Sequence, residues 1–374
     1  MSSLPSYRTT SRWRRLLVLG IAASALWVTS VSLSSAATTR KVTKKTTKKT
    51  AVSAPKTTVS APKTTVTTKA IVPTTTAGST APTAPTATTT PSASVPASIV
   101  NTWKTSTVDP TKLPIGDSMV TTTGAAVGGL WACRAGNPNA GGASADGPWL
   151  NVAAGTWDST TKLAVQGSVT WPTAKYSETV SGGTRVLTTN NVPVDGQTGT
   201  FPIATSDPSY QYDRNPGRIA ERPTTVTLTE KPTINASPSC LSEGPIGILK
   251  NGVFVFSSLD GRGHDAVAHE SQDKCDGHPA MSTYHYHNVP SCVRNAASGS
   301  STVVGWMNDG FPIVVERDTK GALPTNADLD ECHGWTSDVL IDGKVINTYH
   351  YSATLEFPYF VGCLRGTSTV ARNA

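Results

Sequence analysis

The sequence predicts a mainly β protein with few or no long helices. Stretches of alternating polar and apolar residues, separated by Gly, Asn and Pro, indicate strands and turns. A strand-like segment also recurs without gaps in the second half of the chain, and no long segment shows helical periodicity. We therefore expect a duplicated β-rich unit, about 247–292 and 305–363, with pseudo-two-fold symmetry, preceded by a β-rich segment packed on it.

The first 36 residues have the pattern of a signal peptide. Arginines cluster in 8–15, an apolar run covers 16–31, and Ser34 and Ala36 form a small-x-small cleavage site. An uncleaved membrane anchor is the alternative, but the short apolar run followed at once by small residues favours cleavage. We therefore predict an exported protein with no transmembrane segment after signal cleavage.

Residues 37–100 are almost all Thr, Ala, Pro, Ser, Val and Lys, and "VSAPKTT" occurs at 52–58 and again at 59–65. Such a segment has little apolar surface to bury, so it cannot repay the conformational entropy of folding. Its prolines favour extended, partly polyproline-II backbone. We predict a disordered stalk that carries the folded domain.

The two parts of the chain differ in charge. The whole chain has 32 Lys and Arg and 25 Asp and Glu, and residues 1–100 hold 13 of the basic residues and none of the acidic ones. Residues 101–374 therefore hold 19 basic and 25 acidic residues, a net charge of −6, which argues against a nucleic-acid partner. The nine basic residues of 40–69 would suit an anionic cell-wall polymer or a membrane surface, although a solvated spacer explains them as well.

Residues 101–240 read as the N-terminal β part of the domain. The segments 156–171 and 178–194 alternate polar and apolar residues. Several tryptophans are scattered here, and in a β domain such residues are usually core, with a sugar-binding platform as the alternative; they are Trp103, Trp131, Trp149, Trp157 and Trp171.

The chain repeats itself from residue 247 onward, within the duplicated part at 241–367. "GILKNGVFVF" (247–256) aligns on "GWMNDGFPIV" (305–314), and "DKCDGH" (273–278) aligns on "DECHGW" (330–335). "TYHY" occurs at 283–286 and again at 348–351. The eight extra residues of the second copy, "VLIDGKVI" (339–346), are two apolar runs around Asp-Gly, which predicts a tight hairpin.

Six cysteines in an exported chain predict three disulfides. The simplest scheme follows the repeat, with Cys275–Cys292 in the first copy and Cys332–Cys363 in the second. Cys133–Cys240 would then tie the N-terminal β part to the duplicated part, and 101–374 would form a single domain. Six cysteines allow fifteen pairings, so the other schemes stay open.

Several long motifs resemble the YHYH-domain family of exported proteins: "QYDRNPGRI", "SPSC", "DAVAHESQDKCDGHP", "YHYH", "DGFPI", "LDECHGW" and "FPYFVGCLRG". The resemblance covers roughly 115 to 367. It implies export and this domain type, and it brings no activity with it. The chain departs from the family pattern at the second tetrad, where Ser352 stands at a position that is commonly histidine.

All seven histidines lie between residues 264 and 350. On a strand, alternate side chains share a face, so His285 and His287 should project together with Tyr284 and Tyr286 on the other side. Two imidazoles spaced in this way can reach one metal ion. Structural histidines that hydrogen-bond backbone carbonyls are the alternative.

A third ligand must come from elsewhere in the fold. His350 is the repeat mate of His285, so a two-fold axis could bring it close. His278, His333 and Asp273 follow as further candidates because they adjoin the cysteine of each repeat. Imidazole with carboxylate suits zinc or copper. Asp273 and its mate Asp330 have a rival role as acceptors of backbone N–H groups in a Cys-x-Gly turn.

The sequence evidence for other kinds of site is weaker. "HESQD" (269–273) begins like a helical zinc-protease motif, but Asp273 stands where the second histidine is required. Calcium at Asp260 and Asp265 lacks the full ligand set of an EF-hand loop. The sequence also shows no Gly-x-Ser-x-Gly elbow, phosphate loop or dinucleotide fingerprint.

Three hypotheses about function follow. The first is an exported, secreted or cell-wall-associated domain that binds a metal ion or small polar ligand at the first tetrad. The second is an envelope metal-assisted hydrolase or oxidoreductase at the same face, with Asp273 or Glu270 as base. The third is a cell-wall or carbohydrate-binding adhesin with tryptophan platforms and structural histidines. The sequence leaves the oligomeric state open.

Overall fold

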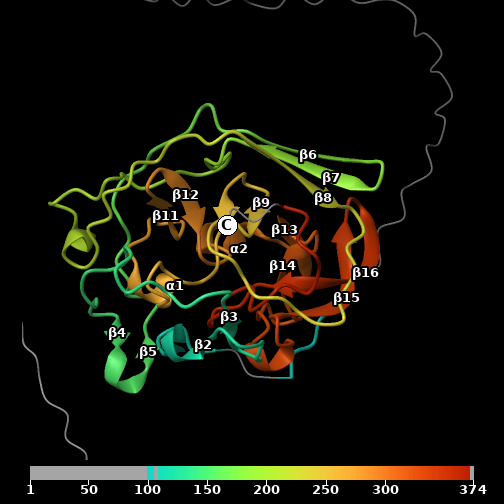
Figure 1. Cartoon of the computed structure of the whole chain (residues 1–374), viewed down its shortest axis with the longest axis horizontal. Coiled ribbons are helices and arrows are strands. Elements are labelled where there is room, and N and C mark those ends of the chain that lie inside the picture. Colours follow the sequence, from blue (N-terminus) through green and yellow to red (C-terminus); the bar gives the residue numbers. More distant parts are fainter. Residues whose placement is uncertain (1–98, 105–107, 371–374) are drawn as a thin grey trace, which may run out of the picture. The chain divides into compact units, whose positions relative to one another are not determined.

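A computed structural model describes residues 99–104 and 108–370 (Figure 1). These residues all belong to one compact unit, which spans 87–374. The predicted signal peptide and nearly all of the predicted stalk lie outside the described residues. None of the helices in the described part is long and apolar enough to cross a membrane.

The centre of the domain is an eight-stranded sheet with the order β11-β12-β10-β9-β13-β14-β16-β15. The first copy of the repeat supplies β9 (Gly247–Leu249), β10 (Phe254–Val255), β11 (Gly277–Ala280) and β12 (Thr283–Tyr286). The second copy supplies β13 (Ser301–Met307), β14 (Pro312–Glu316), β15 (Gly334–Ile341) and β16 (Lys344–Ser352).

Both copies use the same pairing pattern. β9–β10 and β13–β14 are antiparallel, β10–β12 and β14–β16 are parallel, and β11–β12 and β15–β16 are antiparallel. The copies meet where β9 pairs antiparallel with β13, so the strand order runs outward identically on either side. This order is what an approximate two-fold axis between β9 and β13 would produce; the symmetry itself stays a prediction.

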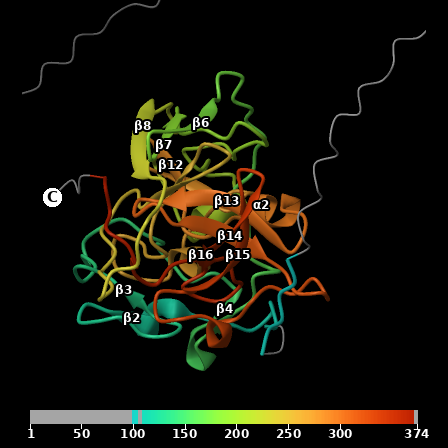
Figure 2. The same ribbon diagram turned by 90° about the vertical axis from the view of Figure 1, so that its right-hand side faces the viewer.

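The sheet is covered on both faces, which is why strands such as β14 are buried at every residue. Alternate residues enter two different cores. Leu249, Val255 and Tyr286 belong to the larger core, whereas Ile248 and Phe254 pack with Leu187 and Leu228 in the smaller one. Figures 1 and 2 both show β6, β7 and β8 on one side of the sheet and β2, β3 and β4 on the other.

The N-terminal part is β-rich but consists mostly of very short strands. β6 (Tyr176–Ser181), β7 (Thr184–Thr189) and β8 (Thr224–Thr229) form one three-stranded sheet, with a turn at Gly182-Gly183 where both φ angles are positive. The remaining strands pair as β1-β5-β4 and β2-β3, and they are β1 (Leu113–Pro114), β2 (Val120–Thr121), β3 (Leu130–Trp131), β4 (Leu150–Asn151) and β5 (Thr156–Trp157).

The expected strand pattern of 156–171 is largely loop. Only Thr156–Trp157 forms a strand there, with isolated bridges at Val165 and Val169. The alternation of side chains therefore reflects an extended segment packed on the domain and not a ladder.

Helices are few and short, as predicted. Among the described residues the two α-helices are α1 (Ala266–His269) and α2 (Ser291–Ala296), and four 3₁₀ turns lie at Gly116–Met119, Val152–Ala154, Pro208–Gln211 and Asn326–Asp328. Asp265 caps α1 by accepting a hydrogen bond from the backbone N–H of Ala268. α1 ends at His269, so "HESQD" does not form the long helix that a zinc-protease motif needs.

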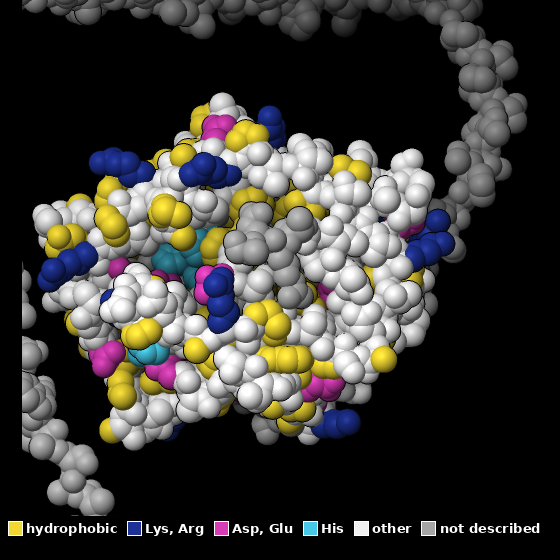
Figure 3. All heavy atoms as spheres, in the orientation of Figure 1, with side chains coloured by type: hydrophobic (Ala, Val, Ile, Leu, Met, Phe, Trp, Pro, Cys, Tyr) yellow, Lys and Arg dark blue, Asp and Glu magenta, His cyan; other side chains and the backbone are white. Residues whose placement is uncertain are grey.

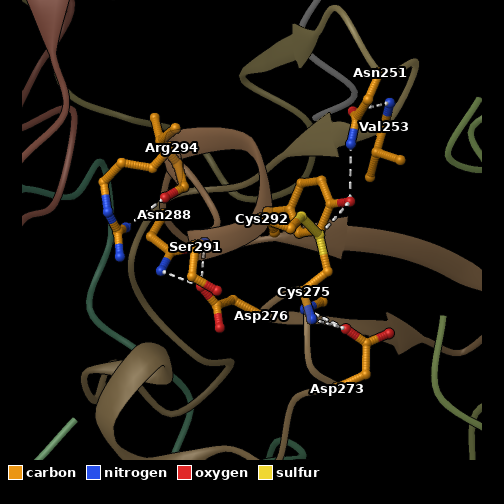
Figure 4. The surroundings of a disulfide bond; sticks show 12 residues. Asn251, Val253, Asp273, Cys275, Asp276, Asn288, Ser291, Cys292 and Arg294 are labelled. Carbon is orange, nitrogen blue, oxygen red and sulfur yellow. Dashed lines mark hydrogen bonds between the residues drawn. A yellow bond between two sulfur atoms is a disulfide. The ribbon is translucent and has the colours of Figure 1, made fainter. Parts of the chain in front are cut away.

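The three disulfides follow the repeat as predicted: Cys133–Cys240, Cys275–Cys292 and Cys332–Cys363. Figure 4 shows the surroundings of Cys275–Cys292, which joins the turn before β11 to α2. The carboxylate of Asp276 accepts the backbone N–H of Ser291 at 2.6 Å and so holds the start of α2 beside this disulfide.

The predicted hairpin at 339–346 is also confirmed. Ile341 pairs with Lys344 across a two-residue turn, Asp342-Gly343, in which both residues have positive φ. The hairpin extends β15 and β16 beyond the corresponding strands of the first copy.

Candidate metal centre

Three histidines meet where the hairpin of β11 and β12 ends. His278 on β11 lies directly opposite His285 on β12, and His287 follows two residues further on the same face. The Nε2 atom of His287 lies 2.9 Å from Nε2 of His285 and 3.1 Å from Nε2 of His278. One ligand atom from each of these residues lies within 4.8 Å of the other two, so a single ion could contact all three.

The outer nitrogens of two of these imidazoles are bound to the backbone. Nδ1 of His285 lies 3.1 Å from the carbonyl oxygen of Thr283, and Nδ1 of His287 lies 2.5 Å from that of Ser257. A carbonyl can only accept, so each Nδ1 carries the proton and each Nε2 presents a lone pair. Two lone pairs that face each other at 2.9 Å repel, and a cation between them removes the repulsion. Outer hydrogen bonds of this kind also orient metal-ligating histidines.

Burial keeps the three imidazoles neutral. All three side chains are at most 3 % exposed. Desolvation lowers the pKa of His287 to about 4 and holds the pKa values of His278 and His285 well below the ordinary value, with the neighbouring imidazoles adding to the effect. The neutral form is the one that ligates a metal, so the site is ready to bind near neutral pH.

Glu270 adds a carboxylate to the cluster. Its Oε2 lies 3.4 Å from Nε2 of His278 and 3.6 Å from Nε2 of His287. It follows α1 directly, so the capped turn at Asp265 determines where it lies. Burial, together with the nearby Asp213 and Asp260, raises the pKa of Glu270 well above its ordinary value. A carboxylate with a raised pKa can bind a metal or act as a base.

Phe256 completes the wall beside the histidines. Its ring stacks on His285 with centroids 3.9 Å apart and meets His287 edge-on at 6.2 Å. Because both rings are held by an aromatic neighbour and by a carbonyl, the two Nε2 atoms have little freedom to turn away from the centre.

The cluster forms part of the lining of an open cleft of about 1130 Å³. Figure 3 shows histidine side chains recessed in a hollow of this face, with acidic side chains next to them. The cleft is also lined by Asn215 and Gly217 from the loop before β8 and by Pro279 and Met281 from the hairpin of β11 and β12. The cleft therefore leads from solvent to the three histidines.

Asp273 does not belong to this cluster. Its Oδ1 accepts the backbone N–H groups of Cys275 and Gly277, and its Oδ2 accepts the N–H of Gly199 and the hydroxyl of Tyr284. Both carboxylate oxygens therefore accept hydrogen bonds from the protein itself. This is the turn role that the sequence offered as the alternative to metal ligation. Asp330 repeats the arrangement with the second copy's Cys-x-Gly turn and Tyr349.

The structure does not bring His350 to the cluster, contrary to expectation. β12 and β16 are separated by four strands, which at the usual strand spacing places them roughly 24 Å apart. The expected axis passes between β9 and β13 and so sends the two tetrads to opposite ends of the sheet, as Figure 1 shows for β12 and β16.

His333 is likewise placed away from the cluster. It occupies the Cys-x-Gly turn of the second copy with φ of 69°, as its repeat mate Asp276 does in the first copy with φ of 57°. Its Nε2 lies 3.0 Å from the hydroxyl of Thr354, so its contacts are those of a turn residue.

In the second copy, only one of the three positions that correspond to the cluster is a histidine. Trp335 lies opposite His350 where His278 lies opposite His285, and Ser352 replaces His287. His350 instead lies 2.9 Å from the carboxylate of Glu316, which also accepts from Trp335 and Ser352. His350 and Glu316 are fully buried, so this end of the sheet is a closed counterpart of the open site.

The two carboxylates suggested as calcium ligands, Asp260 and Asp265, make other contacts in the structure. Asp260 accepts the backbone N–H groups of Arg262 and His264, while Asp265 caps α1 and accepts the hydroxyl of Tyr359. The two carboxylates therefore serve turns and a buried hydroxyl, and they do not form a shared ion site.

Sequence reasoning missed Phe256, Ser257 and Asn215 as neighbours of the histidines. Phe256 and Ser257 directly follow β10, whose parallel pairing with β12 aligns Phe254 with His285. Asn215 lies in the "DRNPGR" loop, and its amide nitrogen lies 3.5 Å from Nδ1 of His278. The loop stood out only as part of the longer motif "QYDRNPGRI".

The fold and site define a disulfide-linked β protein with an open cluster of three histidines and a carboxylate. Residues 225–325 match the model of a family described as "YHYH protein", a stretch that includes the first tetrad and ends before the second. This match supports, for residues 225–325, the resemblance to the YHYH family that the sequence motifs indicate. Comparison with curated proteins finds no match, and comparison with solved structures finds none either.

Proposed function

We propose that this domain binds a divalent transition-metal ion through Nε2 of His278, His285 and His287. The observation that carries the proposal is the convergence of three buried Nε2 atoms, two of them on imidazoles whose Nδ1 protons are directed to backbone carbonyls. Without a cation the inner lone pairs of His285 and His287 oppose one another, whereas a bound ion uses both.

Zinc or copper fits this donor set best. Imidazole nitrogen is a preferred ligand for both, and a neighbouring carboxylate such as Glu270 is compatible with either. Thiolate ligation is excluded for the described cysteines because all six are paired in disulfides.

The open cleft favours a catalytic over a purely structural ion. Three protein ligands with a free position are typical of catalytic zinc sites, whereas structural sites are closed by four. A bound ion would lower the pKa of a water molecule, and Glu270 is placed to accept the proton. The position of Glu270 favours a metal-assisted hydrolase over an oxidoreductase as the second candidate function.

The tryptophans offer little support for an adhesin. Trp149, Trp157 and Trp306 are buried in the cores, and Trp103 packs edge-on against Trp335 with centroids 5.6 Å apart. Rings that are used for packing cannot serve as an exposed platform for sugar rings.

We further propose that the protein is exported and held in the envelope by its basic stalk. The predicted signal peptide supports export, and three disulfides are typical of oxidising compartments. An anionic cell-wall polymer remains the proposed partner of the nine basic stalk residues.

Metal binding is tested on the full chain purified from an exporting host. We expect the chelator-treated protein to take up one equivalent of Zn²⁺ or Cu²⁺ by titration calorimetry and mass spectrometry. His287→Ala should weaken the affinity at least about tenfold because it removes the central ligand. The loaded protein is also assayed with p-nitrophenyl acetate, and a loss of turnover in Glu270→Gln with the ion retained supports the hydrolytic role.

His264→Ala is the matched control, since His264 is half exposed and lies outside the cluster. It should bind the metal like wild type. Near-ultraviolet circular dichroism follows the fold of each variant, and His285→Gln provides a second, less disruptive change. If wild type takes up neither ion, or if both ligand variants keep full metal content, the metal proposal is wrong.

A further inference from the structure

We propose that the cleft over the three histidines receives an anionic substrate, whose carboxylate or phosphate group is held by Arg214 and Arg218. This inference names the substrate class for the proposed metal site and so rests on the proposed function for its catalytic meaning. The binding of the anion by the two arginines can be measured with or without the metal.

Both arginines belong to a loop that forms a wall of the cleft. Arg214 and Arg218 line the same cleft as His278, His285 and His287. Between them lies Asn215, whose amide nitrogen donates to the carbonyl of Pro279 at 2.9 Å, one residue beyond His278. The arginines therefore flank the part of the loop that touches the histidine cluster.

The loop is fixed against β11. The backbone N–H of Arg218 donates to the carbonyl of Met281 at 2.8 Å, and the side chain of Asn215 accepts the N–H of Gly217. A Cβ atom on Gly217 would lie 2.8 Å from the carbonyl oxygen of Met281, closer than side chains approach in real structures. A loop held in this way presents its arginines from a defined position, which reduces the ordering cost of binding.

The charges of the two arginines are free. Both side chains are exposed, and neither makes an ion pair with any residue of the described part of the chain. Arg214 lies over the ring of Tyr210 at 5.7 Å, a contact that orients the guanidinium without neutralising it. Arg134, by contrast, also lines the cleft but is paired with Glu243 at 3.4 Å.

Two of the acidic residues that line the cleft, Asp213 and Asp260, are engaged by backbone N–H groups and not by these arginines. Asp213 accepts the backbone N–H groups of Ser271 and Asn215, and Asp260 accepts those of Arg262 and His264. Their oxygens are thus turned into the protein. The guanidinium group binds carboxylate and phosphate oxygens in pairs, so two free arginines beside a metal site select an oxyanion.

The size of the cleft indicates a substrate larger than a free ion. A volume of about 1130 Å³ is slightly above the usual range for small-molecule sites, which ends near about 1,000 Å³. An oxyanion on the arginines would leave room for the rest of the molecule to extend over the histidines. The proposed substrate is therefore an oxyanion-bearing molecule with its reacting bond at some distance from the anionic group.

The test measures anion binding by the full chain, both chelator-treated and loaded with zinc. Inorganic phosphate and acetate serve as separate probes in titration calorimetry, so that the two oxyanion types are distinguished. Wild type should bind at least one of them, and the double variant Arg214→Gln/Arg218→Gln should weaken that binding about tenfold or more in either metal state.

The double variant Lys320→Gln/Lys344→Gln is the matched control. It removes the same net charge from two exposed residues outside the cleft and should leave the anion affinity unchanged. The inference is overturned if wild type binds neither probe, or if the arginine variant binds as tightly as wild type. Metal content is recorded for each protein, so failure of the metal proposal is seen separately from failure of the anion site.

Discussion

The four residues of the first tetrad, 284–287, point alternately to the two faces of the sheet. Tyr284 and Tyr286 enter the larger core, where their hydroxyls bond to Asp273 at 2.8 Å and to Asn251 at 3.0 Å. His285 and His287 project from the other face of β12 toward the cleft. The tyrosines therefore stabilise the strand, and the histidines face the cleft.

His333 is a buried histidine outside the cluster of His278, His285 and His287. Burial lowers its pKa to about 3, and among the described residues its Nδ1 has no hydrogen-bond partner. The folded protein keeps this imidazole neutral, whereas the unfolded chain takes up a proton below its ordinary pKa of 6.5. Its effect on stability is therefore absent above pH 6.5 and grows as a penalty while the pH falls toward 3.

We expect His333→Asn to make the protein less sensitive to acid. Asparagine tolerates the positive φ at this position and does not titrate. Between pH 7.5 and pH 5 the free energy of unfolding should fall by about 2 kcal/mol less in the variant than in wild type. Urea unfolding at both pH values measures this difference, and the exposed His264→Asn serves as control. Equal losses in wild type and His333→Asn would contradict the prediction.

At the scale of elements, the two copies share their turns as well as their strands. Asp260 and Asp318 each accept backbone N–H groups two and four residues ahead, and Gly263 and Gly321 both have positive φ. The two copies therefore share the same turns and strand pairing. They differ in the side chains on their outer strand pairs, which are β11–β12 and β15–β16. The first presents an open cluster, and the second encloses His350 with Glu316.

The hairpin of β15 and β16 is part of the core despite its origin as an insertion in the repeat. Val339 and Ile341 are buried in the smaller core with Leu187 of β7 and Leu228 of β8. Arg185 of β7 also reaches Asp342 at the hairpin turn, with a distance of 2.8 Å. The extension thus holds the three-stranded sheet over the second copy.

Val339→Ala should lower the free energy of unfolding by about 2 kcal/mol, because it opens a cavity between the hairpin and β7. Val345→Ala changes the same residue type in the same hairpin where the side chain is 39 % exposed, and it should cost less than about 0.5 kcal/mol. Urea unfolding compares the two variants. Equal costs would mean that the hairpin is not packed as described.

At the scale of the whole molecule, the disulfides connect parts that the sheet does not. Cys133–Cys240 joins the segment after β3 to the segment before β9 and closes a loop with a sequence separation of 107. Cys275–Cys292 closes a separation of only 17. Because a longer closed loop restricts the unfolded chain more, the first disulfide should contribute more to stability.

Replacing both Cys133 and Cys240 by serine should lower the free energy of unfolding by about 4 to 5 kcal/mol, against about 3 kcal/mol for the Cys275 and Cys292 pair. Urea unfolding under non-reducing conditions measures both. A larger loss for the shorter loop would show that native packing around Cys275 outweighs the effect on the unfolded chain.

The sequence was sufficient for features that depend on local periodicity and on the repeat. Alternation along β12 fixes which face His285 shares with His287, because neighbouring side chains on a strand must point to opposite sides. The repeat likewise predicted the hairpin at 339–346 and favoured, among fifteen possible pairings, the disulfide scheme that the structure has, since equivalent cysteines tend to take equivalent partners.

The tertiary structure decided which of these side chains meet. His278 lies opposite His285 because the chain turns at Met281-Ser282, a pair without the usual glycine or asparagine that marks a tight hairpin. Glu270 reaches the cluster from the residue after α1, and Arg214 and Arg218 line the same cleft from a loop at least 60 residues upstream of His278. Periodicity determines the face of a strand on which a side chain lies, whereas the order of strands in the sheet depends on long-range pairing and packing. That order places the two tetrads at opposite ends of the sheet, with the histidine cluster in the first copy alone.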